Sequence, residues 1–268
     1  MMPLTALWER ATPAGPALSS DLERLYGGRL DLPAAGVVAN FVSSLDGVVA
    51  LPGVAHSSQM ISDRSEADRF VMGSLRAHAD AVMIGAGTLR GAPDSLWSPA
   101  FIYPEAAPWF VALRHRLGRS QDPRLVILTA KGDIDTTHPA LQEGALVLTT
   151  ARGAAALRDR LPSSSSALAV GDGTSVDLRI AIGVLRRMGY RLILSEGGPT
   201  VVGELLRARL LQELFLTVSP MIAGRSAMGG RPGLVDGAEV LPSDRLGGQL
   251  MSIRTHGSHL FLRYAFRG

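Results

Sequence analysis

Residues 191–200, RLILSEGGPT, join a short apolar run to a glycine pair and a proline. An apolar run of this length, bounded by turn-forming residues, is typical of a strand that is buried on both faces. Proline is favoured in the first turn of a helix, so we expect a helix from Pro199 to about Leu210. A buried strand that leads directly into a helix is the repeating unit of parallel α/β sheets.

The same pattern recurs along the chain and predicts the rest of the sheet. Strands are expected at residues 36–44 (GVVANFVSS), 80–85 (DAVMIG), 124–129 (RLVILT), 145–149 (ALVLT), 167–170 and 214–219 (LFLTVS). Helices are expected after Asp63, which has capping-box spacing to Glu66, and over residues 176–188. The tail, residues 250–266, reads as two strands joined at Gly257-Ser258. We therefore predict an α/β fold with a mostly parallel central sheet, helices on both faces and a C-terminal antiparallel hairpin.

No composition break divides this pattern, so residues 36–268 are expected to form one domain. Residues 1–35 are rich in Pro, Gly and Ser, and they are expected to form a loose N-terminal arm with one short helix around Leu22 and Leu25. Residues 91–123, rich in proline and aromatics, are expected to be a long irregular connection with one short helix.

Composition excludes several classes of chemistry. The 268 residues include no cysteine, which excludes disulfides, thiolate metal sites and cysteine nucleophiles. The six histidines show no metal-ligand spacing, so no metal is expected. The net charge of +3 comes without a basic cluster, so we expect a small anionic ligand and no nucleic acid partner. With no apolar run of about 18 residues, we expect a cytoplasmic protein without membrane contact.

The glycine pair after the strand at 191–195 is the most informative candidate site. Glycines allow a ligand close to the backbone, and the free amides of a helix N-terminus favour phosphate, so a dinucleotide diphosphate is predicted over Gly198 to Val202. The alternative is a plain tight turn. Glu196 stands at the carboxyl end of the strand, where open α/β sheets bind ligands, and it is predicted to hold a polar heterocycle or to serve in proton transfer. The alternative for Glu196 is a carboxylate that only offsets the helix dipole.

Three further segments are weaker candidates. Gly85 and Gly87 also follow a predicted strand, but the third glycine of a dinucleotide fingerprint is replaced by Arg90, so we expect only a second glycine-lined contact. Asp46 belongs to an Asp-Gly pair that is also typical of a turn. Arg76 is a candidate clamp for a substrate phosphate, or else a solvated helix residue.

Taken in order, these segments resemble a known family. Ser44-Leu45-Asp46-Gly47, Leu75-Arg76-Ala77, Gly85-x-Gly87-Thr88, Glu196-Gly197-Gly198-Pro199-Thr200 and Ser219-Pro220 follow one another as in the C-terminal reductase domain of the bifunctional riboflavin-biosynthesis deaminase–reductase, over about residues 36–266. The resemblance implies a dihydrofolate-reductase-like fold. It also implies NADPH-dependent reduction of a ribosylaminopyrimidine 5′-phosphate, with hydride delivered to the ribose C1′, and a homodimer, because the apolar C-terminal strands need cover. A deaminase half would need a zinc site with cysteines, so a stand-alone reductase is expected.

The resemblance also assigns roles to individual residues. Glu196, Asp46 and Asn40 are expected to be catalytic, and Ser58, Arg76 and Glu196 to bind substrate. The expected cofactor contacts are Ser43, Met60, Gly85, Gly87, Thr88, Thr129, Gly197, Gly198, Pro199, Thr200, Val201, Val202 and Glu204. For the 2′-phosphate that distinguishes NADPH from NADH, the candidates chosen by position near strand ends are Thr129, Lys131 and Arg152.

Two departures from the family keep alternatives open. Asn40 stands where the bifunctional enzymes have a lysine, and Met60 where they have a tryptophan. A reductase of another pteridine-like substrate such as dihydrofolate is therefore the second hypothesis. A nucleotide-binding module without catalysis is the third.

Overall fold

The computed structural model describes residues 1–11, 19–171, 173–225, 230–242 and 245–266. In these ranges one sheet of ten strands has the order β1-β9-β10-β8-β2-β7-β3-β4-β5-β6. The strands are β1 Thr5–Glu9, β2 Gly36–Ser43, β3 Ala81–Gly85, β4 Arg124–Thr129, β5 Ala145–Thr149, β6 Ser166–Ala169, β7 Leu192–Ser195, β8 Leu211–Val218, β9 Gly248–His256 and β10 His259–Phe266. The helices are α1 Ser20–Tyr26, α2 Ser57–Ile61, α3 Glu66–His78, α4 Ala86–Arg90, α5 Pro99–Ile102, α6 Ala107–Arg116, α7 Pro139–Glu143, α8 Ala151–Leu157, α9 Leu178–Arg187 and α10 Pro199–Arg207, with a short 3₁₀ helix at Pro104–Ala106.

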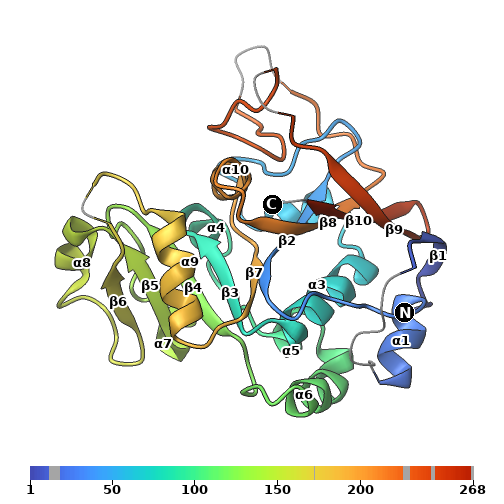
Figure 1. Ribbon diagram of the computed structural model, residues 1–268, viewed down its shortest axis with the longest axis horizontal. Coiled ribbons are helices and arrows are strands. Elements are labelled where there is room, and N and C mark those ends of the chain that lie inside the picture. The colour runs from blue at the N-terminus through green and yellow to red at the C-terminus, as the bar shows by residue number, and fades with distance from the viewer. Residues whose placement is uncertain (12–18, 172, 226–229, 243–244, 267–268) are drawn as a thin grey trace.

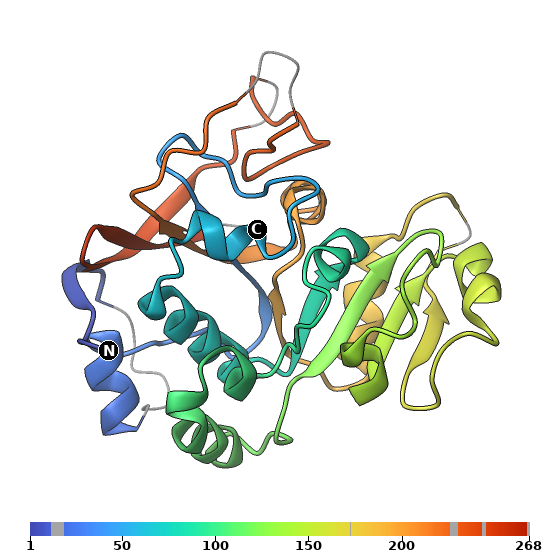
Figure 2. The same ribbon diagram turned by 180° about the vertical axis from the view of Figure 1, so that it is seen from behind.

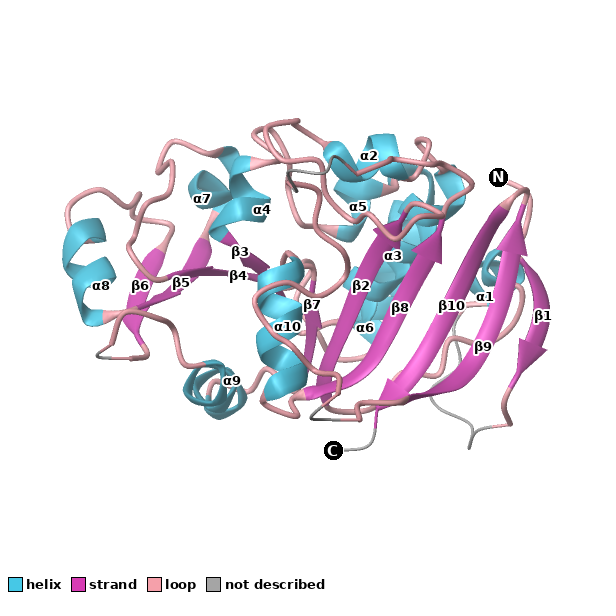
Figure 3. Ribbon diagram, turned by 90° about the horizontal axis from the view of Figure 1, so that it is seen from above, coloured by secondary structure: helices cyan, strands magenta, loops and turns pink. Residues whose placement is uncertain are grey.

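Strands β2 to β8 pair in parallel, whereas β8, β10, β9 and β1 pair antiparallel. Figure 3 shows this antiparallel half beside β2. Because β2, β7, β3 and β4 run in the same direction, the segments that follow them emerge at one edge of the sheet. The predicted mostly parallel sheet with a C-terminal antiparallel hairpin is confirmed.

Each face of the sheet carries its own apolar core. On one face α1, α3 and α6 pack with Leu22, Phe70 and Phe110, each at most 1% exposed. Figure 2 looks onto this side of the molecule. On the other face α9 and α10 bring Ile182 and Leu205 against the strands (Figure 1). Burying apolar surface stabilises the fold by about 25 cal/mol per Å². Because β2 and β7 are covered on both faces, their apolar residues do not alternate with polar ones. The expected placement of helices on both faces is confirmed.

Residues 1–35 are more than a loose arm. The expected short helix exists as α1, but β1 also forms and pairs antiparallel with β9, from Thr5 opposite Thr255 to Glu9 opposite Ser252. The pairing partner lies at the other end of the sequence, so no local pattern could indicate it.

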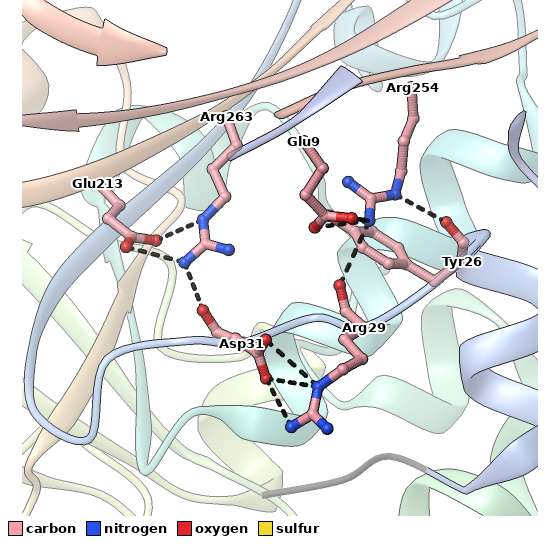
Figure 4. Close-up of polar contacts among 7 residues, drawn as sticks. All are labelled: Glu9, Tyr26, Arg29, Asp31, Glu213, Arg254 and Arg263. Atoms are coloured by element: carbon pink, nitrogen blue, oxygen red, sulfur yellow. Dashed lines mark hydrogen bonds and ion pairs between the residues drawn. The ribbon is translucent and has the colours of Figure 1, made fainter. Parts of the chain in front are cut away.

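Two buried arginines of the C-terminal hairpin hold this segment (Figure 4). Arg254, 1% exposed, donates from Nη2 to both carboxylate oxygens of Glu9 at 3.0 and 3.1 Å and from Nε to the carbonyl of Tyr26 at 3.0 Å. Its guanidinium carbon lies 4.1 Å from the centre of the Tyr26 ring, a cation–π contact. Arg263 pairs with Glu213 through two bonds of 2.9 Å and donates to the carbonyl of Asp31. The N-terminal segment is thereby fixed to the antiparallel half of the sheet.

Two local expectations were wrong. Helix α3 begins at Glu66 with Ser65 as its cap, because the Ser65 hydroxyl accepts the amide of Asp68, while Asp63 lies outside at φ 51°. Residues 91–123 hold α5, a 3₁₀ turn and α6 instead of one short helix. Their helices are short and carry little periodic pattern, and they form because Trp97, Tyr103 and Phe110 are buried in the core.

Candidate active site

A cavity of about 800 Å³ lies at the carboxyl ends of the parallel strands. Its wall includes Asn40 of β2, Gly85 at the end of β3, Thr129 at the end of β4 and Glu196 directly after β7. Helices α4 and α10 begin at this same edge (Figure 1). Open α/β sheets bind their ligands at this edge.

The glycines of the two strand–helix turns border open space. A methyl group added at Gly87 would meet no atom within 4 Å, and one at Gly198 would meet only the Thr88 hydroxyl at 4.0 Å. By contrast, a methyl group at Gly197 would lie 2.8 Å from the Val201 side chain, so Gly197 lets α10 pack closely on its own turn. The cavity therefore comes within reach of the backbone at Gly87 and Gly198.

The N-terminus of α10 offers unpaired amides to this space. Gly198 is the N-cap and provides no side chain to accept a bond, and Val201 donates back to the Gly198 carbonyl at 2.9 Å. The amides of Gly197, Gly198 and Thr200 have no acceptor among the described residues. Free amides at the positive end of a helix dipole suit an anion such as a diphosphate.

Arg76 and Glu196 form a buried ion pair inside the cavity wall. The Arg76 Nε lies 2.9 Å from Oε1 of Glu196, and its Nη2 lies 2.7 Å from Oε2. The two side chains are only 6% and 9% exposed. The remaining nitrogen of Arg76, Nη1, donates to the carbonyls of Leu96 and Ser98 at 3.3 Å each. The guanidinium therefore fixes Glu196 and the loop before α5, rather than standing ready as a phosphate clamp.

Asp68 is a cavity residue that the sequence analysis missed. It precedes Met72 and Arg76 by one and two turns of α3, and all three line the cavity. Burial raises the pKa of its carboxyl to about 6, although a hydrogen bond with Thr217 and the nearby His259 oppose the shift. The sequence did carry one signal for Asp68. Asp68, Met72 and Arg76 are four residues apart, a spacing that places them on the same side of a helix.

Cations line the cavity near the end of β4. Lys131 follows Thr129 by two residues, and Arg90 at the end of α4 donates to the carbonyl of Asp133 at 3.3 Å. Arg90, Thr129, Lys131 and Asp133 all line the cavity. Arg152, the third candidate for a 2′-phosphate contact, is not among the residues that line it.

Most of the predicted site residues are brought together. Those that line the cavity are Asn40, Ser58, Arg76, Gly85, Gly87, Thr88, Thr129, Glu196, Gly197, Gly198, Pro199, Thr200 and Val201. Those that lie outside its wall are Ser43, Asp46, Met60, Val202 and Glu204. Val202 is fully buried in the core beneath α10, Met60 is 55% exposed, and Glu204 borders a separate hollow of about 310 Å³.

Asp46 does not line the cavity; its carboxylate accepts hydrogen bonds that hold two chain segments together. Its Oδ1 accepts from the Ser44 hydroxyl at 2.6 Å and from the Ala223 amide at 3.0 Å, and its Oδ2 accepts from the Gly224 amide at 2.8 Å. These bonds, above all the one from Ser44, lower the pKa of Asp46 to about 2. Asp46 thus ties the turn after β2 to the segment after β8.

In the described ranges, no three His, Asp or Glu side chains gather in a way that could hold a metal ion. No helix of the described chain is long and apolar enough to cross a membrane.

Comparison with known proteins gives the family. A curated 2,5-diamino-6-ribosylamino-4(3H)-pyrimidinone 5′-phosphate reductase of Archaeoglobus fulgidus is 26% identical over 212 residues, which cover 78% of this chain and 90% of that protein. The crystal structure of a pyrimidine reductase-like protein from Corynebacterium diphtheriae matches with a TM-score of 0.69 at 22% identity, covering 92% of this chain and 98% of the other.

A diaminohydroxyphosphoribosylaminopyrimidine deaminase/5-amino-6-(5-phosphoribosylamino)uracil reductase from Thermotoga maritima matches with a TM-score of 0.63 at 20% identity, over 87% of this chain and 57% of that one. These structures share the fold with this chain. The sequence model of the RibD C-terminal domain matches residues 35–262, so the chain belongs to the RibD C-terminal domain family, as its ordered motifs predicted.

Proposed function

We propose that this protein is an NADPH-dependent oxidoreductase that reduces a ribosylaminopyrimidine 5′-phosphate in riboflavin biosynthesis. The observation that carries the proposal is one cavity in which a glycine-lined helix N-terminus and a buried Arg76–Glu196 pair occur together, in a chain of this family. The named activity of the Archaeoglobus fulgidus relative supports the choice of substrate.

The residues present fit a dinucleotide cofactor. The free amides of Gly198 and Thr200 suit its diphosphate, and the open space above Gly87 and Gly198 leaves room for it. When bound, a reduced nicotinamide supplies a hydride. The chain's own task is then to hold the acceptor carbon in line and to exclude water.

The preference for NADPH over NADH rests on the cations near β4. Lys131 and Arg90 line the cavity beside Thr129, and a 2′-phosphate needs a basic, hydroxyl-lined pocket. Replacing Lys131 by Met removes one of these charges. We expect KM for NADPH to rise roughly 10-fold, as for the loss of a charge-assisted hydrogen bond of about 1.5 kcal/mol, with KM for NADH unchanged. An equal rise for both cofactors would contradict this placement.

The substrate side of the cavity is built around Glu196. Both of its oxygens accept hydrogen bonds from Arg76, so its carboxylate is fixed in place. There it can accept hydrogen bonds from the heterocycle of a bound substrate. Ser58 from α2 lines the same space. For the substrate phosphate, Arg69 is better placed than Arg76, because it lines the cavity and has no ion pair within 4 Å among the described residues.

The proposal is tested by supplying the ribosylaminopyrimidine 5′-phosphate and NADPH to the purified protein. We expect NADPH oxidation and, by mass spectrometry, a product with two more hydrogens in which the ribosyl group has become ribityl. Dihydrofolate serves as the control substrate. No turnover with the pyrimidine at saturating cofactor, or faster turnover of dihydrofolate, would overturn the proposal.

We further propose that the protein is a homodimer. On the antiparallel half of the sheet, Leu216, Ile253, Leu262 and Tyr264 point to the face opposite Arg254 and are only partly buried, and Leu260 is 40% exposed. Apolar sheet faces of this kind are usually covered by a partner. Light scattering should give about twice the 28.3 kDa chain mass, and the mass of one chain would contradict the dimer.

A further inference from the structure

The cavity contains a second carboxyl group whose surroundings differ from those of Glu196. Asp68 is 5% exposed and lines the cavity from α3, two helical turns before Arg76. Glu196 has both oxygens engaged by a guanidinium. Asp68 has no ion pair within 4 Å among the described residues.

The groups around Asp68 come from four elements. Thr217 of β8 forms a hydrogen bond with it, His259 of β10 and Arg69 of α3 lie near enough to favour its charge, and Glu196 after β7 disfavours it. His259 lies with Nε2 2.9 Å from the carbonyl oxygen of Ser62. Because a carbonyl only accepts, Nε2 carries the hydrogen. His259 is therefore held in one orientation beside Asp68.

Burial outweighs these favourable neighbours and raises the pKa of Asp68 to about 6. A carboxyl with a pKa close to neutrality is partly protonated at working pH and returns quickly to its protonated form. An ion-paired carboxylate such as Glu196 is unsuited to giving up a proton, because its two oxygens already accept from Arg76. The two acids of the cavity are thus suited to different tasks.

The proposed reaction needs such a proton. In the proposed reaction the ribosylamine ring opens to an imine, a C=N bond between the ribose C1′ and the amine nitrogen. A hydride, which a bound reduced nicotinamide would supply, is added to C1′, and the electron pair of the π bond moves to nitrogen. That nitrogen then takes one proton, and the nicotinamide is left oxidised. We propose that Asp68 is the proton donor of this reduction, with its carboxyl hydrogen passing to the substrate nitrogen and its carboxylate regaining a proton from water through the open cavity. This inference rests on the proposed function.

The test compares Asp68→Asn with two other variants. Asn keeps the size and a polar atom but holds no acidic proton. We expect its kcat for the pyrimidine to fall roughly 100-fold or more, with the Kd for NADPH unchanged and the pH dependence of the remaining rate lost around pH 6. Asp68→Glu retains the acid and should restore part of kcat. Asp63→Asn, an exposed residue outside the cavity, removes the same charge and should keep full activity.

A second readout is independent of turnover. Infrared difference spectra between pH values on either side of 6 should show the C=O stretch of a protonated carboxyl in the wild type and in Asp63→Asn, and should lack it in Asp68→Asn. Absence of an Asp68-dependent band, or full kcat in a folded Asp68→Asn protein, would overturn the inference. A wild-type protein that shows the band but never reduces the pyrimidine would overturn the proposed function, and the donor role with it.

Discussion

Replacing Arg76 by Leu should destabilise the protein strongly. The substitution leaves the Glu196 carboxylate, 9% exposed, without its counter-ion. Removing one partner of a buried ion pair costs about 3–5 kcal/mol. The two 3.3 Å bonds to the carbonyls of Leu96 and Ser98 are long, and their loss adds at most about 1 kcal/mol. We therefore expect a loss of about 4 kcal/mol, which for a chain of this size lowers Tm by roughly 10 °C.

The assay is urea and thermal unfolding followed by circular dichroism, on Arg76→Leu and on the double variant Arg76→Leu/Glu196→Leu. Two apolar side chains can replace a buried ion pair with little cost, so the double variant should recover most of the lost stability while remaining inactive. Arg24→Leu is the matched control, because its pair with Asp21 is exposed on both sides with 3.9 Å between the charged atoms, and such pairs contribute under about 1 kcal/mol.

A loss of stability in Arg76→Leu no larger than that in Arg24→Leu would refute a buried, unpaired Glu196 carboxylate as the cause. A double variant as unstable as the single one would refute it too, because the cost would then lie in lost packing and not in an unpaired charge.

The remaining predictions concern the cofactor and pH. Gly198→Val should abolish NADPH binding by filling the space over the helix N-terminus, whereas Gly173→Val, also in open space but outside the cavity, should leave the Kd unchanged in a calorimetric titration. Burial lowers the pKa of His78 from 6.5 to about 4, so stability present above pH 6.5 should be lost as pH falls through 4, by up to about 3 kcal/mol. Asp68 acts in the opposite direction, because a raised carboxyl pKa stabilises below pH 3.8 and that stability is lost as pH rises through 6. Asp68→Asn should therefore lose stability more steeply with acid than the wild type in urea titrations at successive pH values, and an identical profile would contradict the raised pKa of Asp68.

The parts of the fold that the sequence predicted are those fixed by local pattern. The continuous apolar runs of β2 and β7 and the Gly257 turn of the hairpin gave their elements directly. β1 could not be predicted, because its residues are exposed and its strand exists only through pairing with β9. The helices within residues 91–123 depend likewise on burial of aromatic side chains by other elements.

In the candidate site, too, local features could be predicted from the sequence and long-range contacts could not. The glycine turns were recognisable because strand, glycine and helix are adjacent in sequence. The pairing of Arg76 with Glu196 was not, because the two residues are 120 positions apart and each looked free to bind a ligand. Asp68 was missed because burial, which raises its pKa, is a property of the folded chain.

The most direct test of the central claim is a crystal structure of the protein with NADPH bound. It should show diphosphate oxygens accepting hydrogen bonds from the amides of Gly198 and Thr200, and the nicotinamide facing the side of the cavity that holds Glu196 and Asp68. A cofactor bound outside this cavity, or a diphosphate held away from the start of α10, would contradict the account.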